Sequence, residues 1–143
     1  MAIHMELSRI LIRELNDYQI IELREVLPEG ESREARSFPI VIGRPEAEAI
    51  ERRLKGIPVQ RPQTHDLLAH VINELGGTLK SITINDLSDH TFFASLNIAR
   101  ANGEMLNVDS RPSDAIALGI AGNVPIYVEE HVIAGALADE SES

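Results

Sequence analysis

The amino-acid sequence predicts one compact α+β (mixed α/β) domain built from an internal duplication. Segments that alternate apolar and polar residues, as strands do, occur in both halves of the 143-residue chain, and helical periodicity follows them. The order of these segments repeats, and so do some of their residues. Because 43% of the residues are apolar, a chain of this length can bury a hydrophobic core.

The first half is predicted to contain three strands and two helices. Its strands are expected near 6–13, 18–26 and 37–42, and its helices near 45–55 and 64–75. Thr64 is a suitable N-cap for the second helix, whose apolar residues lie on one face. Gly76-Gly77 then ends this helix.

The second half repeats this order with one more strand. Strands are expected near 79–86, 90–100, 104–109 and 124–128, and helices near 112–121 and 129–137. Arg111-Pro112 starts the first of these helices, because a residue before proline avoids helical geometry and proline suits the first helical position. No side chain from Ala115 to Val128 is charged, so this segment should be buried.

Matching residues support the duplication. RILIRELNDYQII (9–21) aligns without a gap on SITINDLSDHTFF (81–93), and both segments predict a hairpin with an aspartate at its turn. Arg44-Pro45 and Arg111-Pro112 are each followed by another proline at the same spacing. A domain is predicted at 8–137, with halves 8–76 and 77–137. An N-terminal extension at 1–7 precedes it and is expected to consist in part of residues added to the natural chain. A disordered acidic tail is predicted at 138–143.

Composition excludes several classes of protein. The chain has no cysteine, so disulfides and thiolate metal sites are impossible. The first residues, MAIHMELSR, lack the apolar stretch of a signal peptide, and no uncharged run is long enough to cross a membrane, so we expect a cytoplasmic protein. The common signature motifs of nucleotide-binding proteins, serine hydrolases and zinc proteases are also absent.

The net charge of −10 opposes broad attraction to nucleic acid, but the charge is unevenly distributed. Most of the basic residues lie in the first half, and some of them could bind a phosphate backbone: Arg44, Arg52, Arg53 and Arg61. Ordinary pairing on the helix surface with Glu48 and Glu51 explains part of this group equally well. Because the chain has few aromatic residues, a base-stacking platform is not expected.

Two acids mark the strongest candidate site. Asp109 and Asp114 occupy positions where the other copy has Ile42 and Ala47, so the repeated fold does not require their charge. Asp114 could simply interact with the helix N-terminus, and Asp109 could pair with Arg111. Alternatively, Asp109 and Asp114, with Ser113, could bind Mg²⁺ or Mn²⁺, which prefer oxygen ligands.

The stretch RPQTHDLL is a second candidate. His65 and Asp66 lie at the start of a helix, where anions such as phosphate bind well. His65 could act as a general acid or base. In the structural alternative, Asp66 complements the helix dipole and pairs with His70, while His65 is solvated.

RPQTHDLL, INDLSDHTFFASL and VDSRPSDAIALGI with VPIYVEEHV resemble the bifunctional nuclease domain family, formerly a domain of unknown function. The resemblance implies a duplicated α/β fold, a tendency to form homodimers, and hydrolysis of DNA and RNA. It covers the motif residues His65, Asp66, Asp109, Arg111, Ser113 and Asp114. For such a nuclease we expect Asp109 and Asp114 to hold a divalent metal, Arg111 to stabilise charge and His65 to move a proton.

Two functions therefore remain open. The first is nuclease activity by metal-assisted hydrolysis of phosphodiester bonds. The alternative is a non-catalytic dimeric binding or regulatory module, in which the uncharged helix with Gly119 and Gly122 packs closely against a partner.

Overall fold

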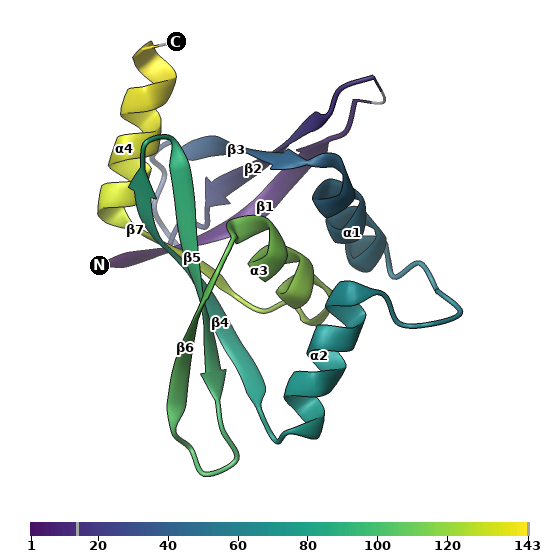
Figure 1. Ribbon diagram of the computed structural model, residues 1–143. Helices are drawn as coiled ribbons and strands as arrows, with labels where there is room; N and C mark the ends of the chain where they lie inside the picture. Colours follow the sequence, from purple (N-terminus) through teal and green to yellow (C-terminus); the bar gives the residue numbers. More distant parts are fainter. Residues whose placement is uncertain (14, 143) are drawn as a thin grey trace.

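The computed structural model of the protein describes residues 1–13 and 15–142, and these residues form one α+β domain, as predicted (Figure 1). The described residues contain a seven-stranded mixed sheet and four α-helices. The elements are β1 (Ala2–Leu11), β2 (Tyr18–Glu25), β3 (Ser37–Gly43), α1 (Arg44–Lys55), α2 (Thr64–Glu74), β4 (Thr78–Ser88), β5 (Thr91–Ala99), β6 (Met105–Ser110), α3 (Pro112–Gly119), a 3-10 turn (Ile120–Gly122), β7 (Ile126–Glu129) and α4 (Glu130–Glu142). None of these helices is long and apolar enough to span a bilayer.

The strand order reflects the predicted duplication. Across the sheet the order is β3-β2-β1-β7-β4-β5-β6, so each half of the chain supplies one antiparallel three-stranded meander. The two meanders flank β7, which pairs antiparallel with β1 and parallel with β4. In the first copy, the segment equivalent to β7, around Ile57–Val59, is a loop.

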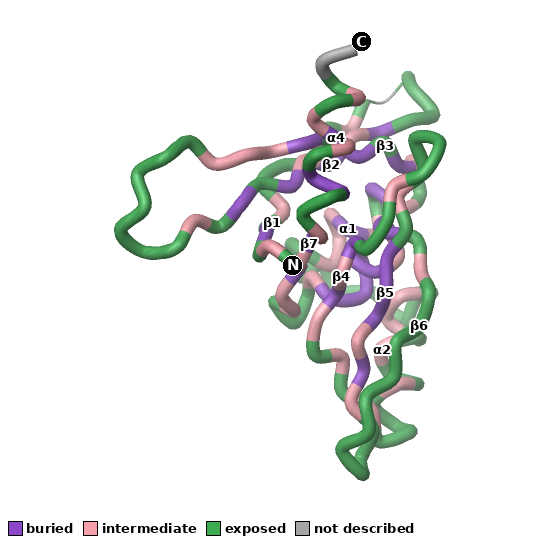
Figure 2. Tube along the Cα trace, turned by 90° about the vertical axis from the view of Figure 1, so that its left-hand side faces the viewer, coloured by how far each residue is buried: buried purple, intermediate pink, exposed green. Residues whose placement is uncertain are grey.

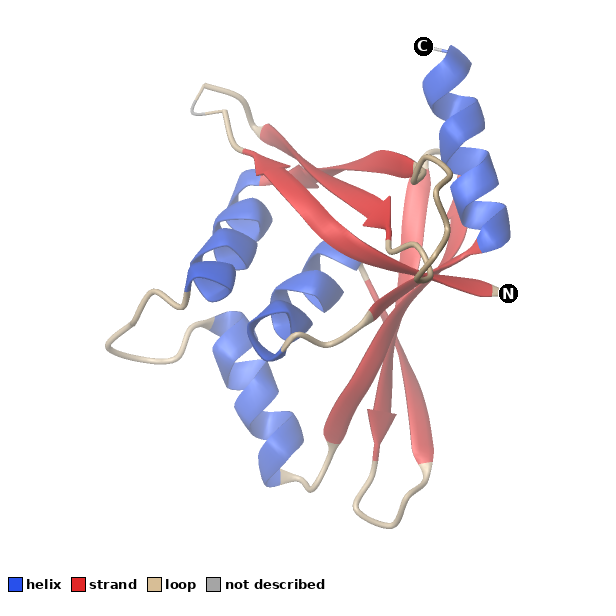
Figure 3. Ribbon diagram, turned by 180° about the vertical axis from the view of Figure 1, so that it is seen from behind, coloured by secondary structure: helices blue, strands red, loops and turns tan. Residues whose placement is uncertain are grey.

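The sheet is curled, and this curl brings its distant strands together. The rings of Phe38 in β3 and Phe92 in β5 stack with centroids 5.6 Å apart, although four strands separate β3 from β5 in the sheet order. Helices α1, α2 and α3 gather on one side of the strands, and α4 stands on the other (Figure 3). Buried residues concentrate inside the curl, whereas the edge strand β6 is exposed along most of its length (Figure 2).

Helix α3 is buried, as its uncharged sequence predicted. Residues Ala115–Gly119 are all buried. A Cβ atom at Gly119 would lie 2.8 Å from Ile82 Cδ1 and 3.0 Å from Val124 Cβ, so only glycine fits there. The expectation that Gly119 packs against a partner is therefore wrong, because this glycine allows α3 to approach the sheet of its own domain.

Both ends of the chain are more ordered than the local sequence pattern indicated. Within the extension expected at 1–7, residues 2–7 belong to β1, where Ala2–Met5 pair with β7 and Met5 is buried. Because β1 and β7 are far apart in the sequence, no local sequence pattern predicts their pairing. The tail expected to be disordered from 138 continues helix α4 to Glu142, because buried Val132 and Ile133 anchor that helix; Ser143 lies outside the described residues.

A buried ion cluster closes the long loop between β2 and β3. The side chain of Glu25 is 1% exposed and accepts hydrogen bonds from Arg33, at 2.8 and 2.9 Å, and from Arg36. Arg36 also pairs with Glu130 at the start of α4. The hydrogen bonds from Arg33 and Arg36 outweigh burial and hold the pKa of Glu25 far below its ordinary value of 4.5.

Replacing Glu25 by glutamine should lower the free energy of unfolding by about 2 kcal/mol at pH 7, because charge-assisted hydrogen bonds to a buried carboxylate are lost. Since folding lowers the pKa of Glu25, its contribution is complete above pH 4.5 and is lost as the pH falls toward the folded value. The difference in stability between wild type and Glu25→Gln should therefore shrink below pH 4.5. Urea unfolding at pH 7 and at lower pH measures it.

Glu31→Gln is the matched control, because Glu31 is half-exposed and pairs with Arg33 at the surface. Its effect should stay below roughly 0.5 kcal/mol. A Glu25→Gln effect that is equally small, or that does not change with pH, would contradict the role of this cluster.

Candidate active site

A polar pocket of about 340 Å³ lies where the first turns of α1, α2 and α3 meet. Its lining residues are Pro45, Glu46, Ala49 and Arg52 of α1, Gln63, Thr64 and His65 around the start of α2, and Arg111 and Asp114 at the start of α3. The first backbone N–H groups of a helix have no partner within the helix and favour anions nearby. Each of these first turns already carries an acidic residue that complements it, namely Glu46, Asp66 and Asp114.

Arg53 of α1 fixes the relative positions of these helices. Its Nε donates to the carbonyl oxygen of Ala117 at 2.6 Å, and its Nη2 donates to that of Leu118 at 3.0 Å. Its Nη1 donates to Asp66 of α2. The side chain is only 10% exposed, so one desolvated guanidinium joins α1 to both α2 and α3.

Asp66 is fully engaged in holding α2. Its carboxylate accepts hydrogen bonds from Arg52 at 2.9 Å, from Arg53, and from the backbone N–H of Gln63 at 3.0 Å. Burial would raise the pKa of Asp66, but these hydrogen bonds outweigh it and keep the pKa below the ordinary value of 3.8. The expected pairing of Asp66 with His70 is not formed among the described residues.

His65, Asp114 and Arg111 form a connected group in the polar pocket. His65 Nε2 lies 3.0 Å from Asp114 Oδ1. Arg111 donates from Nε to Asp114 Oδ2 at 2.8 Å and from Nη2 to Oδ1 at 3.1 Å, a bidentate pair. Arg111 Nη1 also donates to Glu46 Oε1 of α1, at 3.0 Å. We call these three residues the His65–Asp114–Arg111 group.

The charge of Asp114 determines which nitrogen of His65 is free. Burial would raise the pKa of Asp114, but hydrogen bonds from Arg111 and His65 outweigh it and keep the pKa below 3.8. The ionised carboxylate only accepts hydrogen bonds, so His65 Nε2 must carry the proton. The Nδ1 atom of the neutral ring then retains a lone pair that can accept a proton.

Two polar atoms around the pocket are buried without a partner among the described residues, namely Arg52 Nε and Glu46 Oε2. Both atoms lie beneath the surface, and Glu46 Oε2 packs against Gly43, where an added Cβ atom would lie 2.6 Å away, so neither atom is exposed to a ligand in the pocket. Glu46 was not singled out from the sequence, because its contact with Arg111 joins residues that are far apart in the chain.

The other predicted acid, Asp109, is not part of this group. It lies exposed on the edge strand β6, opposite Ser95 of β5, and within the described chain it forms no ion pair with Asp114 or Arg111. The described residues also contain no cluster of three or more histidines and acids that could hold a metal. Metal binding by Asp109 and Asp114 therefore stays a prediction from the sequence.

The basic residues predicted to bind substrate are spread over several sites. Arg44 pairs with Glu48 at 3.1 Å on the surface of α1, and Arg61 lies exposed in the loop before α2. Ser113 is buried and lines a neighbouring apolar pocket. Of the four arginines in the predicted basic group, Arg52 lines the polar pocket.

Comparisons with known proteins agree with the resemblance noted from the sequence. The sequence profile of the bifunctional nuclease domain matches residues 26–141. An uncharacterized protein of Mycobacterium tuberculosis is 38% identical over 138 residues, which are 90% of this chain and 82% of that protein. Bifunctional nuclease 2 of Oryza sativa subsp. japonica is 25% identical over 93 residues, or 64% of this chain and 29% of the plant protein.

Bifunctional nuclease 1 of Arabidopsis thaliana is 20% identical over 97 residues, or 66% of this chain and 30% of that protein. The alignments with both plant proteins thus span less than a third of the plant chains. The family profile, by contrast, covers most of this chain and includes all three residues of the His65–Asp114–Arg111 group. The protein therefore belongs to the bifunctional nuclease domain family.

Proposed function

We propose that the protein hydrolyses phosphodiester bonds of DNA and RNA in the polar pocket. The observation that supports this most strongly is the hydrogen bond between His65 and the ionised Asp114, next to Arg111. Hydrolysis of a phosphodiester needs donors for the charged phosphate oxygens and a group that moves a proton. Nucleic acid as the substrate follows from the family and from the names of the plant relatives.

In the proposed reaction, His65 Nδ1 accepts a proton from a water molecule as the water oxygen bonds to phosphorus. The bond from phosphorus to the leaving oxygen breaks, and that oxygen takes a proton from the imidazolium or from solvent. Asp114 stays ionised, orients the ring and stabilises its positive charge. Arg111, whose side chain is 63% exposed, donates to the phosphate oxygens.

Assistance by Mg²⁺ or Mn²⁺ is a separate proposal, and no step above depends on it. The residues fit a protein-bound cation poorly, because Arg111 and His65 already engage both oxygens of Asp114. Mg²⁺ commonly binds through one or two carboxylates, with water and phosphate oxygens as its other ligands. Asp109 and Asp114 could therefore help to bind a cation that enters the site together with the substrate.

A cytoplasmic location stays a prediction.

Our second proposal is a homodimer formed through helix α2. None of the residues of α2 is buried. Its outer surface carries an apolar stripe of Leu67, Leu68 and Val71, continued by Leu75 at the C-cap, with exposed fractions of 56%, 39%, 43% and 81%. Contiguous exposed apolar side chains commonly mark an interface, and a second copy of the same stripe would cover it with two-fold symmetry.

Replacing His65 by glutamine should reduce kcat for cleavage of DNA and RNA by roughly 10²- to 10⁴-fold, the usual contribution of a general base. Asp114→Asn should also reduce kcat by at least roughly tenfold, because asparagine neither fixes the ring nor stabilises its charge. Steady-state kinetics on a fluorescent oligonucleotide measures both effects.

His70→Gln is the control, since His70 is exposed on the same helix and lines neither the polar nor the apolar pocket. It should retain wild-type activity when purified by the same steps, which also controls for contaminating nuclease. Undiminished cleavage by folded His65→Gln protein would rule out the proposed reaction.

Treatment with EDTA should abolish cleavage if a divalent cation takes part, and added Mn²⁺ should restore it. In that case Asp109→Asn should raise the Mn²⁺ concentration for half-maximal rate by roughly tenfold, because a carboxylate ligand is lost. Equal activity in EDTA and in Mg²⁺ would show that no divalent cation takes part. The His65–Asp114–Arg111 group would then be the catalytic unit by itself.

The double variant Leu67→Glu/Val71→Glu should be monomeric, because like charges would face each other across the proposed two-fold interface. Light scattering after size-exclusion chromatography measures the mass. Leu54→Glu, on α1, changes a similarly exposed leucine outside the stripe and should leave the dimer intact. A wild-type protein that is monomeric at micromolar concentration would refute the proposed dimer.

A further inference from the structure

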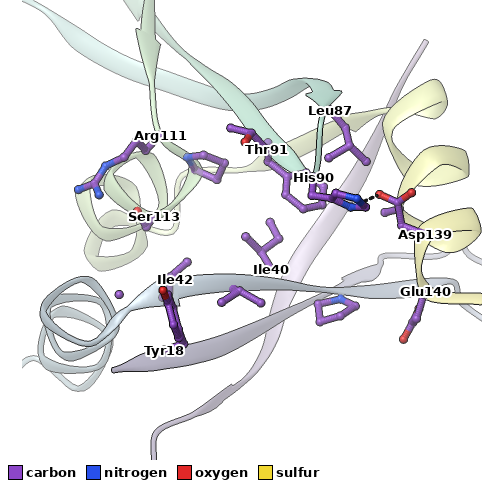
Figure 4. Close-up of a pocket in the computed structure, with 16 residues that line it drawn as sticks. Tyr18, Ile40, Ile42, Leu87, His90, Thr91, Arg111, Ser113, Asp139 and Glu140 are labelled. Atoms are coloured by element: carbon purple, nitrogen blue, oxygen red, sulfur yellow. Dashed lines mark ion pairs between the residues drawn. The ribbon is translucent and has the colours of Figure 1, made fainter. Parts of the chain in front are cut away.

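A second, largely apolar pocket of about 520 Å³ meets the polar pocket at the start of α3. β3, the tip of the β4–β5 hairpin, the start of α3 and the end of α4 line it (Figure 4). It exists because the curl of the sheet brings β3 opposite the β4–β5 hairpin. We call it the apolar pocket.

The apolar pocket has the size and chemistry of a site for a flat, largely apolar group. Ile40, Ile42 and Phe92 supply apolar surface, and Phe92 is held in place by its stacking on Phe38. Tyr18 lies at the rim with 73% of its surface exposed, so its ring is available to a ligand. Sites for small ligands typically have volumes of about 300–1,000 Å³ and are mostly apolar.

The two ends of the apolar pocket carry opposite charge. Arg111 lies at one end, and Asp139 and Glu140 of α4 lie at the other, with Ile40 and Ile42 between them (Figure 4). His90 pairs with Asp139 at 3.3 Å. Because acids repel phosphate, an anionic ligand should keep its charged group at the Arg111 end.

Arg111 connects this pocket to the proposed reaction centre. Its side chain lines both pockets and is held in the polar pocket by Asp114 and Glu46. Of the residues that follow it, Ser113 lines the apolar pocket and Asp114 lines the polar one. A phosphate in the polar pocket would therefore have its own nucleoside next to the apolar pocket.

We propose that the apolar pocket receives one unpaired base of the strand whose phosphate lies in the polar pocket, so that the protein acts on single-stranded nucleic acid. This inference rests on the proposed nuclease function. A base can lie in such a pocket only when it is unpaired and unstacked, which a duplex resists. The few aromatic residues exclude a long stacking platform, but they do not exclude a pocket for one base with Tyr18 against its face.

The experiment compares cleavage of a single-stranded oligonucleotide, its perfect duplex, and the same strand built with abasic tetrahydrofuran residues. Wild-type protein should cleave the single strand at least roughly tenfold faster than the duplex. Tyr18→Ala should raise KM for the single strand roughly tenfold with little change in kcat, because the stacked ring is lost. On the abasic strand, wild type and Tyr18→Ala should have the same KM.

Tyr127→Ala is the matched control, because Tyr127 is the other tyrosine of the chain and lines neither pocket. It should keep the wild-type KM on all three substrates. Equal cleavage of duplex and single strand, or an equal effect of Tyr18→Ala on the abasic strand, would overturn the base-binding pocket and leave the nuclease function intact. If no substrate is cleaved at all, the proposed function itself fails.

Discussion

The site depends on the guanidinium group of Arg53, which holds three helices together. No residue of helix α2 is fully buried, and Ala69 and Ile72 pack only partly buried against the core, so hydrophobic burial makes a modest contribution to its position. Arg53 instead ties Asp66 of α2 to the carbonyl oxygens of Ala117 and Leu118 near the end of α3, where a helix lacks its own donors. His65 precedes Asp66 in the chain, so this contact also sets where the imidazole meets Asp114.

The same use of arginine shows how an acidic protein could form the anion site that we propose. Most of the arginines in the first half that were expected to face a phosphate backbone are engaged with acids: Arg44 with Glu48, and Arg52 and Arg53 with Asp66. A net charge of −10 therefore coexists with a small pocket at which the largely exposed guanidinium of Arg111 still presents N–H groups. Such a protein would hold its substrate through a few directed contacts, and binding would depend weakly on salt.

The sequence predicted the elements well and the contacts between them poorly. The helix starts at proline, and the burial of the uncharged helix α3, follow from local rules. The prediction that Thr64 caps α2 is wrong by one residue, because Gln63 is the N-cap and forms a capping box with Asp66. His65 and Asp114 were each singled out, but their contact joins residues 49 positions apart and depends on packing that no local pattern records. Arg53 was predicted to bind substrate, but it donates to two backbone carbonyls and to Asp66 instead. No local sequence pattern marks these contacts, so they could not be predicted.

The duplication explains why the polar pocket lies where it does. Helices α1 and α3 are equivalent and both begin with Arg-Pro, yet Arg44 pairs along its own helix, whereas Arg111 reaches from the second copy to Glu46 of the first. His65 and Arg52 likewise come from the first copy and Asp114 from the second, so neither copy alone contains the group. Asp114 replaces the fully buried Ala47 of the first copy. A carboxylate at that position is tolerated in α3 because Arg111 of the same helix start and His65 of the other copy both engage it. This departure from the repeat therefore lies where the two copies meet.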